Sequence, residues 1–159
     1  MKKTNLSEYD RQQVPDGSGC RIAIVVAEWN AAITEAMLQG AYETLQDNGV
    51  VAENIEVRHV PGTYELPTGA DLLLQGNEDI DAVICIGCVI QGETRHFDFI
   101  CQAASNGIME VALRYHKPVI FSVLTTESME QAEARAGGKH GNKGVEGAIS
   151  ALKMCQYNK

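Results

Sequence analysis

The sequence predicts an α/β fold, a three-layer αβα sandwich in which a four-stranded parallel sheet lies between two layers of helices. Four segments rich in β-branched residues carry this prediction: 20–27, 54–60, 81–90 and 119–125. The first and third segments are almost wholly apolar rather than alternating, which is typical of strands that helices cover on both faces. The stretches between the segments are long enough for the helical crossovers that join parallel strands.

These connecting stretches show the apolar spacing of helices. In residues 31–48 apolar side chains recur at every fourth position, and Gly49 is the expected helix end. The four positions are Ile33, Met37, Ala41 and Leu45. A second helix is expected to begin near Pro67, because proline suits the first helical turn. Further helices are expected over residues 97–116, 128–136 and 143–157, and the last should bury Val145, Ile149 and Leu152.

Length and composition indicate a single domain, residues 20–159, preceded by a polar N-terminal tail, residues 1–19. The 159 residues are about the size of one domain, and the turn formers at 15–19 separate the tail from the body. A net charge of -8 argues against a nucleic-acid partner. The longest apolar run, Ala82–Ile90, is far shorter than the ~20 residues that span a bilayer. The chain start carries no apolar signal segment, so we expect a cytoplasmic protein with reduced cysteines.

Two motifs that suggest redox or nucleotide chemistry are better explained as parts of a strand. Cys85 and Cys88 have C-x-x-C spacing, but side chains three apart on a strand face opposite sides of a sheet. They should therefore form neither a disulfide nor a shared metal site. Residues 87–94 differ from a P-loop at Glu93, which stands in place of the phosphate-binding lysine. The histidines show no metal-ligand spacing, so no metal is expected.

Ligands of parallel sheets bind beyond the carboxyl ends of the strands. The segments to consider are therefore 28–30, 61–67, 91–98 and 125–128. Thr94 lies between a strand end and a helix start, where its hydroxyl and the backbone N–H groups can hold one phosphate. His96 close by is either a proton shuttle or a histidine that only hydrogen-bonds at the helix start. Trp29, the only tryptophan, either stacks on a flat heterocyclic ligand or closes the core under a loop.

Four blocks of this sequence resemble the lumazine synthase family, in the family's order, from about residue 20 to 157. They are AEWN at 27–30, VPGTYELP at 60–67, GCVIQGETRHFD at 87–98 and VLTTESMEQA at 123–132, which continues through RAG at 135–137 to GNKG at 141–144. The resemblance implies a flavodoxin-like fold and a transferase of riboflavin biosynthesis. Such an enzyme condenses 5-amino-6-(D-ribitylamino)uracil with 3,4-dihydroxy-2-butanone 4-phosphate to 6,7-dimethyl-8-ribityllumazine, phosphate and water, and it uses no cofactor.

The resemblance also implies roles for individual residues. Trp29 matches the aromatic that stacks on the pyrimidine, and His96 matches the proton donor. Arg135 matches the cation that pairs with the phosphate, and Lys143 matches a basic residue close to the site. Phe121 matches an aromatic that the neighbouring subunit supplies. The remaining matches are Thr63, Tyr64 and Glu65 for the ribityl chain, Cys88, Val89 and Ile90 for the pyrimidine edge, and Glu93 and Thr94 for the phosphate-holding turn.

Members of the family form homo-oligomers, which implies a pentamer here or a shell of twelve pentamers. The short link at residues 137–144 is like that of shell-forming relatives and favours the sixty-subunit shell. Three residues depart from the family's pattern: Trp29 stands where phenylalanine is commoner, Gln91 where arginine is frequent, and Arg95 where proline or threonine is usual. The wider ring of Trp29 suggests that riboflavin-like products could bind.

Two alternatives to a synthase remain. A flavodoxin-like flavin-binding protein without synthase activity would share the layers and the acidity, but it should hold the flavin phosphate in a Ser/Thr/Gly-rich loop after the first strand. Residues 28–30 do not form such a loop. A shell protein that has lost catalysis would not need the complete set of Trp29, Glu65, Thr94, His96 and Arg135 that the sequence retains.

Overall fold

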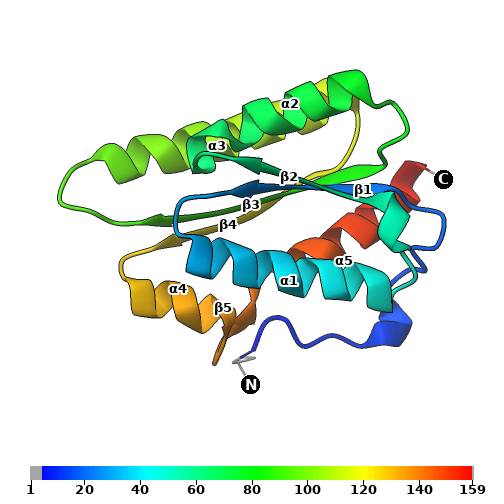
Figure 1. Ribbon diagram of the computed structural model, residues 1–159, viewed down its shortest axis with the longest axis horizontal. Helices are drawn as coiled ribbons and strands as arrows, with labels where there is room; N and C mark the ends of the chain where they lie inside the picture. The colour runs from blue at the N-terminus through cyan, green and yellow to red at the C-terminus, as the bar shows by residue number, and fades with distance from the viewer. Residues whose placement is uncertain (1–4, 159) are drawn as a thin grey trace.

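Four parallel strands form the centre of the molecule in the computed structural model, which describes residues 5–158 (Figure 1). The strands are β1 (Ile22–Ala27), β2 (Ile55–Val60), β3 (Ala82–Ile90) and β4 (Val119–Thr126). Their order across the sheet is β2-β1-β3-β4, and every neighbouring pair is parallel. All six residues of β1 are buried, because helices cover both faces of this central strand.

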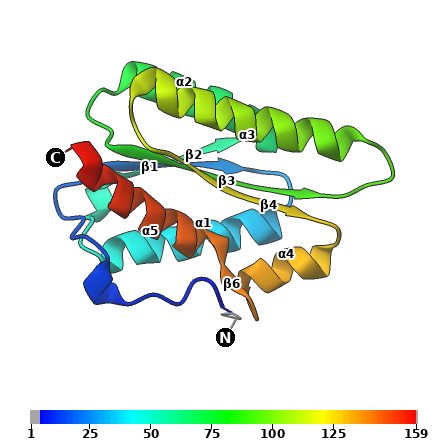
Figure 2. The ribbon, with the colours of Figure 1, turned by 180° about the vertical axis from the view of Figure 1, so that it is seen from behind.

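Helices cover the sheet in two layers, which confirms the expected αβα sandwich (Figures 1 and 2). On one face lie α2 (Leu66–Gly76) and α3 (His96–Tyr115), and on the other lie α1 (Ala31–Asp47), α4 (Met129–Arg135) and α5 (Lys143–Cys155). A small hairpin, β5 (Ala136–Gly138) and β6 (Gly141–Asn142), joins α4 to α5. Four single-turn 3₁₀ helices complete the chain: Arg11–Gln13, Ala52–Asn54, Thr63–Glu65 and Gln156–Asn158.

Each face of the sheet has its own apolar core. Ile24, Ile84 and Ile86 pack with α1 and α5, whereas Val25 and Val83 pack with α2 and α3. In α1 the four positions expected from the sequence are all buried, as are Ala70, Leu73 and Leu74 of α2. The sequence pattern therefore identifies the inward faces of both helices.

Helix α5 buries a different face from the expected one. Leu152 is fully buried, but Val145 and Ile149 are only partly buried. The buried stripe consists mainly of small residues: Gly144, Gly147, Ala148 and Ala151. A Cβ at Gly144 would overlap the carbonyl oxygen of Met37 in α1, so the two helices approach almost backbone to backbone. Small residues permit this approach, and their weak hydrophobicity hides the buried face from a pattern based on large side chains.

The N-terminal segment, expected from the sequence to be a tail over residues 1–19, runs along the α1 and α5 side of the body from residue 5 onward (Figure 1). Residues 1–4 lie outside the described part. Val14 is buried, Tyr9 packs against the core, and the Leu6 N–H donates to the His140 carbonyl at 3.3 Å. Among residues 5–158, no helix has the length and apolarity to cross a bilayer.

Candidate active site

The carboxyl ends of the four strands meet at one edge of the sheet, on the left in Figure 1. Register places Ala27 beside Val60 at the end of β1 and β2, and Ile90 beside Thr126 at the end of β3 and β4. Beyond Ile90, the Gln91 N–H donates to the Thr126 carbonyl at 2.8 Å, so β3 and β4 remain joined into the loops. Two of the four sequence blocks, 27–30 and 60–67, therefore begin at this edge, and the other two, 87–98 and 123–132, span the ends of β3 and β4.

Trp29 lies on the surface at this edge, because the chain makes a sharp turn between β1 and α1. Asn30 adopts a left-handed conformation (φ 61°), which asparagine tolerates better than most residues, and its side chain donates to the Cys88 carbonyl at 2.9 Å. The Trp29 ring is 66% exposed and lies against Gly62. An exposed ring held on a glycine is suited to stacking on a flat ligand, so the structure does not support a tryptophan that closes the core.

The segment Thr63–Glu65 forms one 3₁₀ turn behind Trp29. Tyr64 is exposed, and the Glu65 carboxylate accepts a hydrogen bond from the Gly62 N–H at 3.0 Å. Thr63 is 5% exposed, and its hydroxyl oxygen has no hydrogen-bond partner among the described residues. That hydroxyl lies against Gly87, where a Cβ would come within 2.5 Å. Two hydrogen-bonding side chains and a tyrosine here could receive a polyol.

The end of β3 contributes mainly backbone N–H and carbonyl groups to this edge. Cys88 is 4% exposed, and burial raises the pKa of its thiol to about 11, so the thiol is protonated and a poor nucleophile at neutral pH. Cys85 packs with the α2 and α3 core and Cys88 with the α1 and α5 core, which confirms that the two sulfurs face opposite sides of the sheet. Val89 and Ile90 are half-buried at the strand end.

The turn between β3 and α3 is open to solvent. Glu93, Thr94 and His96 are all exposed, and the His96 N–H donates weakly to the Thr94 hydroxyl at 3.4 Å. His96 is the first residue of the 20-residue helix α3, so unsatisfied N–H groups and the positive end of the helix dipole lie beside it. The turn thus offers an anion both backbone donors and a hydroxyl.

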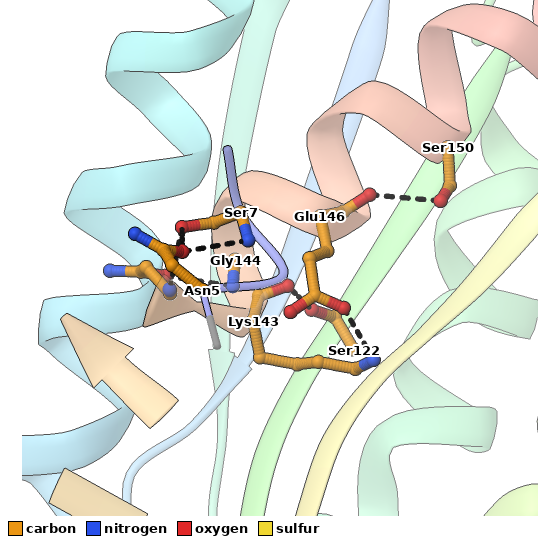
Figure 3. Close-up of polar contacts among 8 residues, drawn as sticks. Asn5, Ser7, Ser122, Lys143, Gly144, Glu146 and Ser150 are labelled. Carbon is orange, nitrogen blue, oxygen red and sulfur yellow. Dashed lines mark hydrogen bonds and ion pairs between the residues drawn. The ribbon is translucent and has the colours of Figure 1, made fainter. Parts of the chain in front are cut away.

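A cationic cleft of about 640 Å³ lies beside the end of β4. Arg135 ends α4 and Lys143 begins α5, and both line the cleft together with Thr125 and Thr126 of β4. The Lys143 ammonium pairs with Glu146 at 2.9 Å, and the Lys143 carbonyl accepts from the Ser122 hydroxyl at 2.7 Å (Figure 3). Cationic side chains in the lining of a cleft suit a ligand that carries a phosphate.

Phe121 does not join the other residues. It lies five positions before Thr126, the last residue of β4, which at ~3.3 Å per residue places it roughly 16 Å from the carboxyl edge. The structure thus brings Trp29 and the segments 63–65, 88–90, 93–96 and 135–143 to one edge and leaves Phe121 away from it.

Several residues of this edge were not singled out from the sequence. Lys139 and His140 line the cleft from the hairpin, and Glu130 and Gln131 line it from α4. Lys139 had a signal, a charge within a glycine-rich link. Glu130 and Gln131 had none, because they are polar residues of a short helix like any other. Among residues 5–158, no cluster of His, Cys, Asp and Glu side chains is able to hold a metal ion.

Comparison with known proteins points to the same family as the four sequence blocks. The family model for 6,7-dimethyl-8-ribityllumazine synthase matches residues 19–159. Three similar proteins carry the name 6,7-dimethyl-8-ribityllumazine synthase. The one from Porphyromonas gingivalis is 57% identical over 95% of this chain and 93% of its own length. The one from Cytophaga hutchinsonii is 59% identical over 94% of this chain and 93% of its own length. The one from Parabacteroides distasonis is 53% identical over 97% of this chain and 96% of its own length. The chain therefore belongs to the 6,7-dimethyl-8-ribityllumazine synthase family.

Proposed function

We propose that the edge described above is where this chain, a transferase of riboflavin biosynthesis, condenses 5-amino-6-(D-ribitylamino)uracil with 3,4-dihydroxy-2-butanone 4-phosphate. The products are 6,7-dimethyl-8-ribityllumazine, phosphate and water. The observation that carries the placement is the cationic cleft of Arg135 and Lys143 beside the end of β4, next to the turn that carries Thr94. No feature of the structure favours a flavin carrier without synthase activity.

The pyrimidine substrate is proposed to lie on Trp29 with its edge against the backbone of Cys88, Val89 and Ile90. The exposed ring provides a stacking face, and strand-end carbonyls and N–H groups provide donors and acceptors. The ribityl chain would then reach Thr63, Tyr64 and Glu65. The exposed Tyr64 and the Glu65 carboxylate, which is held at the edge by its hydrogen bond from the Gly62 N–H, support this placement, because both can hydrogen-bond to substrate hydroxyls.

The phosphate substrate is proposed to lie between the Glu93–Thr94 turn and the cleft. Backbone N–H groups and the Thr94 hydroxyl would hold the phosphate on one side, and the guanidinium of Arg135 on the other. Because this phosphate is also the leaving group, the same cation that binds it favours its departure. Lys143 adds positive charge at the rim of the cleft while it pairs with Glu146.

The chemistry requires imine formation with loss of water, elimination of phosphate and ring closure, and each of these steps is accompanied by proton transfer. His96 is proposed as the group that gives and takes these protons, because its imidazole can both donate and accept a proton and lies at the turn beside Thr94. Holding both substrates in contact supplies much of the remaining rate enhancement. Cys88, with its raised pKa, is not needed as a nucleophile.

The enzyme is proposed to act in the cytoplasm as a homo-oligomer, a pentamer or a shell of twelve pentamers. Phe121 lies away from its own edge and is exposed, which supports a role at the edge of a neighbouring subunit. Helix α3 also exposes Phe99, Met109 and Leu113, an apolar face that a second subunit could cover. Light scattering at neutral pH measures the assembly: a mass near sixty chains supports the shell, and a mass near five chains excludes it.

The direct test of the proposed function is an assay with both substrates, in which formation of the lumazine is followed by its absorbance. Arg135→Ala should nearly abolish turnover, because the phosphate loses its main cation, whereas His96→Ala should slow turnover more modestly, because water and buffer replace part of the proton transfer. Glu8→Ala, a substitution of a charged residue in the exposed part of the N-terminal segment, serves as the control. Full activity in both site variants would contradict the assignment.

A further inference from the structure

Arg135 and Lys143, two of the three cationic side chains that line the cleft, are carried by different helices, and a hairpin of seven residues, which carries the third, Lys139, separates them. Arg135 is the last residue of α4, and Lys143 is the first residue of α5. The hairpin is bonded to α4, because the His140 N–H donates to the Ala134 carbonyl at 2.8 Å. Gly138 lies so close to α4 that a Cβ would come within 2.8 Å of the Ala134 Cα. The position of the hairpin therefore sets the distance between the cations.

Asn142, the last residue of the hairpin, connects it to two helices. Its side-chain oxygen accepts from the Gly144 N–H at 2.8 Å and so caps the start of α5. Its side-chain nitrogen donates to the Ala36 carbonyl in α1 at 3.0 Å. Gly40 provides the room, since a Cβ at that position would lie 2.6 Å from the Asn142 amide nitrogen. The Asn142 amide group thus adds a polar link between the start of α5 and α1, beside the close packing of the two helices at Gly144 and Met37.

Helix α1 also anchors the other side of the site. It begins at Ala31, two residues after Trp29, and the side chain of Asn30, the residue before the helix, donates to the Cys88 carbonyl near the end of β3. The proposed pyrimidine side and the cationic cleft are therefore attached to the same helix, at Asn30 and at Ala36. The Asn142 contact is the one side-chain hydrogen bond among the described residues that joins the start of α5 to α1.

The N-terminal segment holds the hairpin from outside (Figure 3). The Asn142 N–H donates to the Ser7 hydroxyl oxygen at 3.1 Å, and that hydroxyl donates to the Asn5 side-chain oxygen at 2.8 Å. Gly141 has a left-handed backbone (φ 88°), and a Cβ there would overlap Asn5 and Ser7, so the segment lies directly on the hairpin. The N-terminal segment thus supports Asn142, which lies between Arg135 and Lys143 in the chain.

We propose that Asn142 is a positioning residue for the phosphate substrate and that Ser7 supports it from the N-terminal segment. The inference rests on the proposed function of the cleft. Neither residue touches the substrate. Asn142 keeps Lys143 and the hairpin at a fixed distance from Arg135 and from the pyrimidine side, so its loss weakens phosphate binding without removing a reacting group.

The test measures steady-state kinetics for both substrates and competitive inhibition by inorganic phosphate. In Asn142→Ala we expect the KM for the butanone phosphate and the Ki for inorganic phosphate to rise together by about tenfold, while kcat and the KM for the pyrimidine change less than about twofold. Ser7→Ala should show the same pattern at about two- to threefold, and Ser7→Thr, which keeps the hydroxyl, should restore the wild-type values. Ser150→Ala is the matched control, because it removes one serine hydroxyl whose bond, at 2.8 Å to the Glu146 carbonyl, lies within α5.

Unchanged phosphate KM and Ki in folded Asn142→Ala, or an equal rise in the KM of both substrates, would overturn the proposal. If Asn142→Ala does not fold, Ser7→Ala and Ser7→Thr carry the test, because they alter one half-buried hydroxyl in the N-terminal segment. A wild-type enzyme that forms no lumazine would refute the proposed function instead. Calorimetric binding of inorganic phosphate to the wild type and Asn142→Ala would still decide whether Asn142 positions an anion site.

Discussion

Replacement of Gly62 by alanine tests whether Trp29 is the stacking platform, because this change moves the ring without altering its chemistry. A Cβ at Gly62 would lie 2.5 Å from Cε3 and 2.7 Å from Cζ3 of Trp29. Carbon atoms in contact lie ~3.5–4.0 Å apart, so the ring must withdraw by about 1 Å. The backbone at Gly62 (φ −144°, ψ 179°) is extended and suits alanine, so the perturbation falls mainly on the ring, and the next nearest atom, Oε2 of Glu65, would lie 3.2 Å from the new Cβ.

We expect Gly62→Ala to weaken binding of the pyrimidine substrate and to leave the free energy of unfolding almost unchanged. Aromatic pairs contribute ~0.5–1.5 kcal/mol beyond area burial, and a misplacement of ~1 Å can reduce a rate about a hundredfold. We therefore expect kcat/KM for the pyrimidine to fall by about ten- to a hundredfold in Gly62→Ala. The free energy of unfolding should change by less than about 1 kcal/mol, because the exposed ring can move outward into solvent.

The assay uses the chain's only tryptophan as its own reporter. In the wild type, binding of the lumazine product should quench Trp29 fluorescence, and in Gly62→Ala the quenching midpoint should move to higher ligand concentration in parallel with the loss of kcat/KM. Gly76→Ala is the matched control, because no atom lies within 4 Å of a Cβ there. Quenching and kinetics that match the wild type in Gly62→Ala would refute a stacking role for Trp29, and an equal loss in Gly76→Ala would show that the effect is not local.

Two further predictions concern the cores. Burial raises the pKa of the Cys85 thiol from 9.0 to about 12, so its contribution to stability is complete below pH 9 and is lost as the pH rises towards 12. Between pH 8 and pH 10 the free energy of unfolding in urea should fall by about 1.4 kcal/mol more in the wild type than in Cys85→Val, and equal falls would contradict the assignment. Gly144→Ala should lower the free energy of unfolding by about 3 kcal/mol, because the new Cβ overlaps a backbone carbonyl of α1 that cannot rotate away. If Gly144→Ala lowers the free energy of unfolding no more than the surface substitution Gly76→Ala does, the close contact between α1 and α5 is contradicted.

The strands and the first two helices follow from local sequence pattern because their buried faces consist of large apolar residues at regular spacing. In α1 the fourfold spacing identifies the inward face, and in β3 the two-residue period separates Cys85 from Cys88. The inward face of α5 could not be predicted in this way. Its burial depends on the close approach of Gly144 to Met37, which lies more than one hundred residues earlier in the chain.

The residues of the candidate site also differ in whether the local sequence pattern predicts them. The strand-end rule alone places Trp29, Thr94 and His96 at one edge, because parallel strands end together. It does not identify the cleft, whose cations Arg135 and Lys143 come from the end of one helix and the start of another. Those two residues enter the prediction only through the resemblance of the blocks that contain them. The support from Ser7 was not foreseen, because the N-terminal segment has no sequence signal for the hairpin it contacts.

The proposed homo-oligomer would account for the apolar side chains that the single chain exposes at its surface. Trp29 is 66% exposed and Tyr64 is 56% exposed at the edge, while α3 presents further apolar side chains to solvent. Large apolar patches of this kind are rare on monomers. In the proposed oligomer, Phe121 of one subunit would approach the edge of the next and exclude water from the stacked pyrimidine, where electrostatic interactions with the departing phosphate strengthen. The same contact that assembles the subunits would therefore complete the environment in which Arg135 and His96 act.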